Sequence, residues 1–453
     1  MKTKLLYKYF LKIAFMGMMA SIVIPMAFSG GRTLNTENLP AYVEEIPDCM
    51  IFTSIEVDTM PTRANPSDFI IFTWGEIPNT VRTNSWGDFA NMDSVMSDLY
   101  ACGFNTSMFI PAMNLSDIKL ARKNNLTVLL QRNYIPVDTN TQVFADNKFE
   151  QYMKAITDPD DRKAVYAVLL IDEPKTTHFP LLKIWCNAIK KQHVLPYINL
   201  FSDHINPDTV KAKDYNEYLD KFIEYCEPSI LSYDYYAFKE GGIFLEDQFY
   251  SSIETIRKKA LDNDIPFWNT ILSKAHFFYD EPTDAMMALQ VYSTLAYGGK
   301  GIGHFSYYTG QIGNYRLGAI DRFGHRTQTW KIIRNINLQI HSLVPFYSKL
   351  KSVNVFHTGQ PPKNCQGFDS SVLLESISGD HLLVGEFKDT TSGKPSVIVV
   401  NKSLSSSIAF DIKFKEYATD RILLINPYNR DRIPFEGEQK WLAPGYGVLL
   451  TVE

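Results

Sequence analysis

The middle of the chain alternates between short apolar segments and longer amphipathic ones. Eight segments rich in β-branched and aromatic residues recur at intervals of about 20 to 40 residues, as expected of buried strands. These segments begin near Phe69, Phe104, Leu126, Val165, Tyr197, Ser229, Pro266 and Gly301. Segments with helical periodicity lie between them, at residues 92–101, 115–124, 179–192, 214–226, 245–262 and 284–297.

This alternation predicts an α/β fold, a (β/α)8 TIM barrel. Eight strands with their helices over about 250 residues are typical of that barrel. The alternative is an open doubly wound sheet, which usually carries a glycine-rich phosphate loop after its first strand. No such loop follows residues 69–78. We therefore predict a barrel over residues 67–345, closed by a helix at 330–343.

The pattern changes after the barrel. Short alternating segments are separated by turns rich in Gly, Ser, Asn and Asp. They lie at residues 353–357, 372–376, 382–387, 396–400, 408–414, 421–426 and 447–452. This pattern predicts a C-terminal antiparallel β-sandwich over residues 346–453.

The first residues have the pattern of a targeting segment. Lys2, Lys4, Lys8 and Lys12 precede an apolar stretch at 13–28, and Ala27-Phe28-Ser29 fits a small-x-small cleavage site. We predict a signal peptide at 1–29 and a secreted or periplasmic protein without stable membrane insertion after cleavage. The alternative is an uncleaved membrane anchor. A polar leader at 30–66 follows, with one strand expected at 50–57.

Composition narrows the classes of partner. The chain is 45% hydrophobic and 21% charged, with a net charge of −5, so it has ordinary globular composition and no basic stripe for nucleic acid. Its five cysteines are widely spaced, without the paired spacing of a metal site, and we expect neither a disulfide framework nor a cofactor. They are Cys49, Cys102, Cys186, Cys226 and Cys365.

Candidate chemistry is concentrated where the fourth apolar segment ends. Four apolar residues from Val168 run into Asp172 and Glu173, and Pro174 should end the strand. In a barrel the carboxyl ends of the strands form the rim on which active sites are built. Partial burial there would raise the pKa of Glu173, as a general acid requires. The alternative is that the two acids cap a helix or bind an arginine.

The other predicted strand ends carry amides, acids and many aromatic residues. Aromatic faces stack on the C–H faces of sugar rings, while amides and acids bond the hydroxyl groups. Phosphate chemistry would require basic clusters or helix-start glycines, and a serine nucleophile would require a G-x-S-x-G turn, which is absent. The predicted substrate-binding residues are Trp74, Arg132, Asn199, Tyr233, Tyr236, Trp268, His304, Tyr307 and Tyr308.

The motif Asp172-Glu173-Pro174 at the end of a fourth strand resembles the acid/base motif of clan A glycoside hydrolases. Within that clan, the chain is most similar to the family 42 β-galactosidase-like group. The resemblance covers residues 67–453 and implies a barrel with a C-terminal β-sandwich, retention of anomeric configuration, and Glu173 as the acid/base. Asp172 stands where the clan usually has Asn.

A glycoside hydrolase needs a second carboxyl group. The clan places its nucleophile, a Glu, at the end of strand seven, but residues 267–273 contain no acid. We predict instead that Asp234, within 232–236 at the end of strand six, is the second catalytic carboxylate. Its alternative is a structural role. Glu281 could fold back from the loop after strand seven, and Glu76 and Asp203 are lesser candidates.

The sequence therefore predicts an exported glycoside hydrolase that cleaves oligo- or polysaccharide with Glu173 and Asp234. Loops at 276–282 and 307–321 are expected to shape the cleft. The main alternative is a non-catalytic glycan-binding barrel that has lost its nucleophile, and a lyase or transglycosylase using Glu173 is a third. Sugar, linkage, exo or endo action, stereochemistry and oligomeric state are not determined by the sequence.

Overall fold

The structure, a computed structural model, describes residues 61–75, 87–111, 114–131 and 141–453. The predicted signal peptide, most of the leader with its expected strand, Cys49, Glu76 and Arg132 lie outside the described residues.

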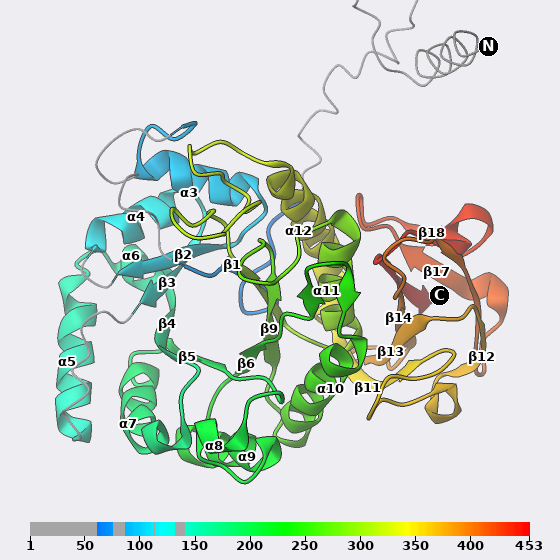
Figure 1. Ribbon diagram of the computed structural model, residues 1–453, viewed down its shortest axis with the longest axis horizontal. Helices are drawn as coiled ribbons and strands as arrows, with labels where there is room; N and C mark the ends of the chain where they lie inside the picture. Colours follow the sequence, from blue (N-terminus) through cyan, green and yellow to red (C-terminus); the bar gives the residue numbers. More distant parts are fainter. Residues whose placement is uncertain (1–60, 76–86, 112–113, 132–140) are drawn as a thin grey trace, which may run out of the picture. The chain divides into compact units, whose positions relative to one another are not determined.

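Eight parallel strands form a barrel, which confirms the predicted fold class (Figure 1). Around the sheet their order is β1, β10, β9, β6, β5, β4, β3, β2. Two backbone hydrogen bonds close it between β2 and the β1 side, from the Asn105 N–H to the Ile71 carbonyl (3.3 Å) and from the Phe109 N–H to the Gly75 carbonyl (3.2 Å). The strands are β1 (Ile70–Thr73), β2 (Thr106–Pro111), β3 (Thr127–Gln131), β4 (Val165–Asp172), β5 (Leu195–Leu200), β6 (Leu231–Asp234), β9 (Phe267–Leu272) and β10 (Gly301–Phe305).

Helices connect the strands, and every helix expected from the sequence is present. Side-chain caps define several starts: Asn91 accepts from the Ser94 N–H, and Thr283 from the Met286 N–H. Two helices after β3, α5 and α6, were not anticipated, because their polar sequence has weak periodicity. The helices are α3 (Met92–Ala101), α4 (Leu115–Lys123), α5 (Gln142–Ala155), α6 (Pro159–Ala164), α7 (Phe179–Lys190), α8 (Pro207–Val210), α9 (Tyr215–Cys226), α10 (Glu246–Asp262), α11 (Asp284–Ala296) and α12 (Gln328–Tyr347).

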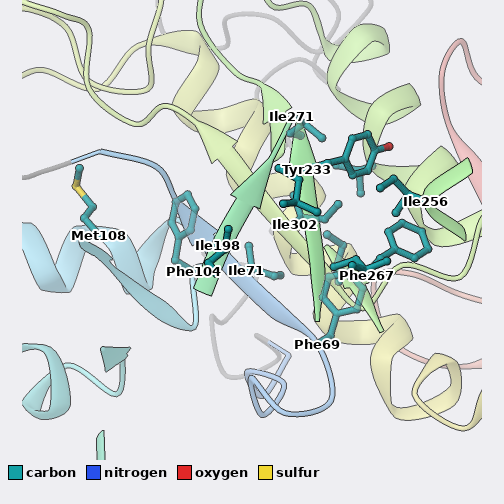
Figure 2. Close-up of a cluster of buried hydrophobic side chains, with 14 of the residues drawn as sticks. Phe69, Ile71, Phe104, Met108, Ile198, Tyr233, Ile256, Phe267, Ile271 and Ile302 are labelled. Carbon is teal, nitrogen blue, oxygen red and sulfur yellow. The ribbon is translucent and has the colours of Figure 1, made fainter. Parts of the chain in front are cut away.

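Alternate residues on each strand point to opposite faces of the sheet. Phe72, Tyr197 and Trp268 face inward and fill the barrel, with ring centroids 5.5–5.8 Å apart. A Cβ at Gly301 would lie 2.6 Å from the Trp268 ring, so only glycine allows this ring to fit. Outward-facing residues such as Ile302 join the larger core between sheet and helices (Figure 2).

The C-terminal region is built of antiparallel strands, as predicted. A six-stranded sheet has the order β11, β13, β14, β20, β17, β18, and two-stranded pairs β12–β16 and β15–β19 accompany it. It has a separate apolar core that includes Phe356, Phe410 and Phe414. The strands are β11 (Leu350–His357), β12 (Leu374–Ser378), β13 (Leu382–Asp389), β14 (Pro395–Asn401), β15 (Ile408–Ala409), β16 (Asp411–Phe414), β17 (Ile422–Ile425), β18 (Arg432–Pro434), β19 (Trp441–Leu442) and β20 (Gly447–Val452).

Barrel and sandwich meet along α11, within one compact unit. Gly385 of β13 lies directly against the backbone carbonyl of Ala296, and Gly445 lies against that of Ala285. The Lys402 ammonium, which is almost fully buried, forms an ion pair with Glu246 of α10 at 2.8 Å. This close backbone approach orients the barrel against the sandwich. Among the described residues, no helix is long and apolar enough to cross a membrane.

We expect Gly385→Ala to destabilise the protein by about 1–3 kcal/mol, because the added methyl group overlaps the Ala296 carbonyl. Urea unfolding of the full chain measures the change. Gly367→Ala is the matched control, since the nearest atom to its added Cβ is 3.9 Å away. Equal stability of the two variants would contradict the close approach at the seam.

Candidate active site

Polar side chains from β4, β5 and β6 converge inside the mouth of the barrel, at the carboxyl ends of the strands. Asp172 is the register partner of Asn199, and Asn199 is the partner of Ser232 on the next strand. The Asn199 amide donates to Asp172 at 3.2 Å and to Asp234 at 2.6 Å. Both carboxylate oxygens bond to the same nitrogen, so they lie no more than about 6 Å apart.

The orientation of Asn199 is determined by its other neighbour. The Ser232 hydroxyl donates to the Asn199 side-chain oxygen at 2.9 Å. That contact assigns the oxygen to Ser232 and leaves the NH2 group for the two carboxylates. Ser232 in turn lies 3.2 Å from the Tyr197 hydroxyl deeper in the barrel. The amide is thus buried, oriented and shared between two acids.

Glu173 follows β4 in a left-handed backbone conformation, with φ of +49°. This conformation is uncommon for a residue with a side chain and is often found at functional sites. Two hydrogen bonds hold the turn: the Glu173 N–H donates to the Asn199 carbonyl at 2.8 Å, and the Tyr218 hydroxyl donates to the Pro174 carbonyl at 2.8 Å. The strand therefore ends at Asp172, and Glu173 projects at the mouth with solvent-exposed surface.

All three carboxyl groups have raised pKa values, and burial is the first cause in each. Burial, followed by the charges of Asp234 and Asp172, raises the pKa of Glu173 to about 8. Burial and the Asp172 charge raise the pKa of Asp234 to about 7, against hydrogen bonds from Asn199 and Tyr236 that lower it. Burial also raises the pKa of Asp172, opposed by Asn199. Like charges this close do not all ionise near neutral pH, and of Glu173 and Asp234 it is Glu173 that keeps its proton to higher pH.

Aromatic rings form one wall beside these acids. Tyr236 hydrogen-bonds to Asp234, and its ring lies 5.4 Å from Tyr279, 5.5 Å from Phe305 and 5.9 Å from His276. Burial and the charges of Asp234 and Glu173 raise the pKa of Tyr279, which places this phenol beside the carboxylates. The wall combines apolar faces with hydroxyl groups, as a sugar-binding surface requires.

Of the residues proposed from the sequence, Glu173, Asp234, Asn199 and Tyr236 are brought together at the mouth. Trp74 lies half-buried next to the barrel interior, edge-on to Phe109 at 5.0 Å. Trp268 lies in the interior with only 2% of its surface exposed, so it supports the mouth from within the barrel core. Arg132 lies outside the described residues.

The other four proposed sugar-binding residues are buried. Tyr233 faces outward among apolar side chains (Figure 2), and Tyr308 is only 6% exposed. His304 contacts Ser273 at 3.0 Å and Asn337 of α12 at 3.1 Å, and the Tyr307 hydroxyl donates to Asp98. Because strand residues alternate in direction, Tyr233 and His304 point to the opposite face from their neighbours Asp234 and Phe305. A strand-end position alone does not distinguish these two faces.

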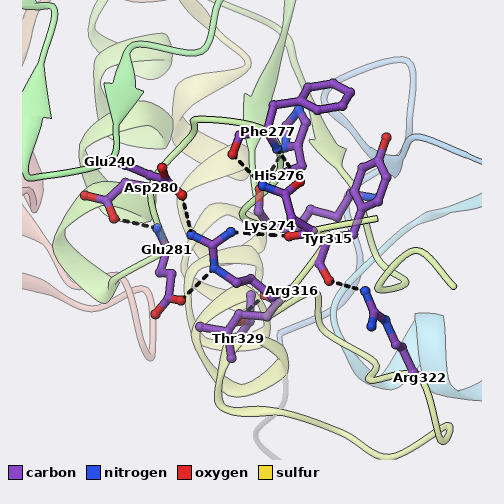
Figure 3. Close-up of polar contacts among 12 residues, drawn as sticks. Glu240, Lys274, His276, Phe277, Asp280, Glu281, Tyr315, Arg316, Arg322 and Thr329 are labelled. Carbon is purple, nitrogen blue, oxygen red and sulfur yellow. Dashed lines mark hydrogen bonds and ion pairs between the residues drawn. The ribbon is translucent and has the colours of Figure 1, made fainter. Parts of the chain in front are cut away.

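The lesser carboxylate candidates have structural partners. Glu281 is exposed and forms an ion pair with Arg316 at 2.8 Å (Figure 3). Asp203 accepts hydrogen bonds from Ser251 (3.1 Å) and Ser252 and contacts His204. The end of β9 carries Ser273 and Lys274 rather than an acid.

Asp172, which the sequence indicated beside Glu173 at the end of the fourth strand, completes the carboxyl cluster. One further group at the mouth was not singled out from the sequence. Lys274 lies after β9, 6% exposed, with its ammonium 4.6 Å from the Tyr315 ring centroid and 4.9 Å from that of Phe305. Burial lowers the pKa of Lys274 to about 8. The sequence signal that could have identified Lys274 was its position directly after an apolar strand.

Within the described part of the chain, no group of three His, Cys, Asp or Glu side chains could hold a metal ion.

Comparisons with known proteins find likeness only among solved structures, since no family model and no curated protein matches the chain. The endo-β-1,4-mannanase of Thermotoga petrophila is 12% identical over 76% of this chain and 97% of its own, with a TM-score of 0.40. The endo-β-1,4-glucanase of Xanthomonas axonopodis pv. citri is 10% identical over 60% and 98%, with a TM-score of 0.40. The β-galactosidase of the psychrophilic Marinomonas ef1 is 8% identical over 63% of each chain, with a TM-score of 0.41. None of these likenesses assigns a family to the chain.

We expect Glu173→Gln to raise the melting temperature relative to wild type more at pH 8.5 than at pH 4. The folded state holds the Glu173 proton up to a pKa of about 8, against an ordinary value of 4.5. The wild type therefore loses stability as pH rises between these values, and the neutral amide does not. Melting curves across this range test the expectation, with Glu438→Gln in the exposed part of the sandwich as control. If the difference in melting temperature between Glu173→Gln and wild type did not change with pH, the raised pKa of Glu173 would be contradicted.

Proposed function

We propose that the protein is an exported glycoside hydrolase that cleaves oligo- or polysaccharide. The observation that carries this proposal is the group of three carboxyl groups at the barrel mouth, Asp172, Glu173 and Asp234, with upward-shifted pKa values and an adjacent aromatic wall. Glycosidic bond hydrolysis requires one carboxyl group that is protonated and another that is ionised on either side of the bond. The pKa of Glu173 lies above that of Asp234, and this difference supplies that asymmetry.

Glu173 is proposed as the general acid. It retains its proton above the pH at which Asp234 ionises, and its side chain is accessible at the mouth. In the first step its proton passes to the glycosidic oxygen as the bond from that oxygen to the anomeric carbon breaks. Water then attacks the anomeric carbon: its proton passes to the ionised Glu173 where Asp234 acts as nucleophile or stabiliser, and to Asp234 where Asp234 acts as base.

Asp234 is proposed as the second carboxylate, acting as base, nucleophile or electrostatic stabiliser of the positive charge at the anomeric carbon. Hydrogen bonds from Asn199 and Tyr236 hold its oxygens in place and favour the ionised form. Asn199 also ties Asp234 to Asp172, so a change at one acid alters the other. Trp74 and Tyr279 are proposed to contact the sugar.

The motif Asp172-Glu173-Pro174 supports placing the protein in clan A, in the family 42 β-galactosidase-like group, with the catalytic barrel at 67–345 and the sandwich at 346–453. In this proposal Asp172 takes the position of the usual Asn. Asn199 on the next strand then provides the amide at the site. Strand seven (β9) has no acid at its end, unlike the clan, and Asp234 at the end of strand six (β6) takes the role of that acid.

We expect Glu173→Gln to lower kcat/KM about 10²- to 10⁴-fold on glycosides whose leaving group needs protonation. The loss should be much smaller on 2,4-dinitrophenyl glycosides, whose leaving group departs without a proton. In the wild type the rate should fall above about pH 8, as Glu173 ionises. Initial rates over a panel of aryl glycosides measure both effects. Equal losses on good and poor leaving groups would remove Glu173 from the role of acid.

A glycan-binding barrel without catalysis is the second candidate, and the lack of an acid at the end of β9, in residues 267–274, favours it. The two candidates differ in one measurement. If no aryl glycoside or polysaccharide of the panel is cleaved while sugars still raise the melting temperature, the binding function stands and the hydrolase is rejected.

Export is proposed from the N-terminal pattern of a charged region, an apolar region and a small-x-small site. We expect the mature chain to begin at Gly30. Intact mass of the full-length protein recovered from the expressing cells measures this. A mass that includes residues 1–29 would contradict cleavage and favour the membrane anchor.

A further inference from the structure

Beyond the carboxylates, the loop after β9 presents two exposed phenylalanines, Phe277 and Phe278. They are 59% and 57% exposed, and they follow His276, which is 97% buried. From these observations we propose that Phe277 and Phe278 form a sugar-stacking platform for a part of the substrate that does not carry the bond to be cleaved. This inference rests on the proposed function, because its ligand is the carbohydrate chain.

The platform is held rigidly. Phe277 has a left-handed backbone with φ of +49°. The Asn314 side chain accepts from the Phe277 N–H at 2.7 Å and donates to the Phe277 carbonyl at 2.5 Å. Such a conformation costs free energy, so it persists only where neighbouring contacts impose it. The ring points away from the polar contacts that hold its backbone (Figure 3).

Three loops from the same end of the barrel are joined beneath the platform. Arg316 forms ion pairs with Glu240 and Glu281, each at 2.8 Å (Figure 3). Ala275 and Arg316 exchange two backbone hydrogen bonds of 3.0 Å. These contacts link the segments that follow β6, β9 and β10, so the platform cannot shift without breaking them. A preordered surface of this kind binds without a large ordering cost.

Contacting rings connect the platform to the carboxylates. Phe278 lies 4.8 Å from Tyr279, Tyr279 lies 5.4 Å from Tyr236, and Tyr236 bonds to Asp234. The Lys239 ammonium lies 4.4 Å from the Phe278 ring centroid and 3.8 Å from that of Tyr279. This row of rings leads outward from the proposed cleavage site and ends at the exposed Phe278.

The chemistry of the platform fits a sugar better than an apolar partner. Its rings are bordered by charged and amide groups, among them Glu240, Asn314 and Arg316. A pyranose ring has the matching surface, with apolar C–H faces and hydroxyl groups around its edge. An apolar peptide would remove the exposed ion pairs of Arg316 from water and offer them no new hydrogen bonds. The substrate class is therefore an oligo- or polysaccharide rather than a monosaccharide glycoside.

The test uses the full chain carrying Glu173→Gln, which is expected to slow cleavage, in native gels cast with mannan, β-glucan, galactan or xylan. We expect retardation by at least one polysaccharide, and about 3- to 10-fold weaker affinity for Phe277→Ala and for Phe278→Ala. Phe277→Tyr should retain the affinity. Phe323→Ala is the matched control, since Phe323 is 74% exposed but packs its backbone against Gly87 rather than joining the platform. Melting temperatures confirm that each variant is folded.

The active chain provides the second readout. Phe278→Ala, at an ordinary backbone position, should raise KM for the polysaccharide by a larger factor than KM for aryl monoglycosides, which do not reach the platform. Unchanged affinity in both platform variants, an equal loss in Phe323→Ala, or no retardation of the parent chain by any of the four polysaccharides would overturn the platform. These outcomes are independent of the leaving-group test of Glu173, so the platform can fail while the hydrolase stands.

Discussion

One buried amide positions the acids of this protein. Asn199 places its nitrogen between Asp172 and Asp234, and Ser232 prevents the amide from turning over. Two carboxylates this close repel each other, and the amide provides partial compensation without neutralising either charge. Burial at the mouth, followed by the charges of Asp234 and Asp172, raises the pKa of Glu173 to about 8. The protonation asymmetry on which the proposed chemistry depends is thus a consequence of how three neighbouring strands place their last inward-facing residues.

The rest of the structure maintains that arrangement. Phe72, Tyr197 and Trp268 fill the barrel below the mouth, so the polar groups above them are held against a rigid floor. The glycines of β10 permit this filling, because a side chain there would overlap the rings. The helix α11 packs behind β9, and its close contact with β13 of the sandwich holds it there. Local strain at Glu173 and Phe277 occurs where side chains must be presented outward.

The mouth has two regions with different chemistry. Its acidic region lies over β4 to β6, and its aromatic and basic region lies over β9 and β10, with Tyr236 and Tyr279 between them. Lys274 belongs to the second region, and its ammonium is enclosed by rings and the Tyr308 carbonyl rather than by an acid. The position after strand seven therefore carries no negative charge, and the second carboxylate of the proposed mechanism comes from β6.

The sequence by itself determined the barrel, the sandwich, the strand positions and the acidic turn at Asp172 to Pro174, because apolar periodicity and chain-breaking residues act locally. It also indicated Asp234 and the aromatic loop. Tertiary structure decided which face each strand-end residue occupies: Tyr233, His304 and Tyr307 joined the core, while Asp172 and Lys274 joined the mouth. A strand-end residue faces the mouth or the helices according to register, tilt and closure of the whole barrel, and these are set by contacts between residues far apart in the chain.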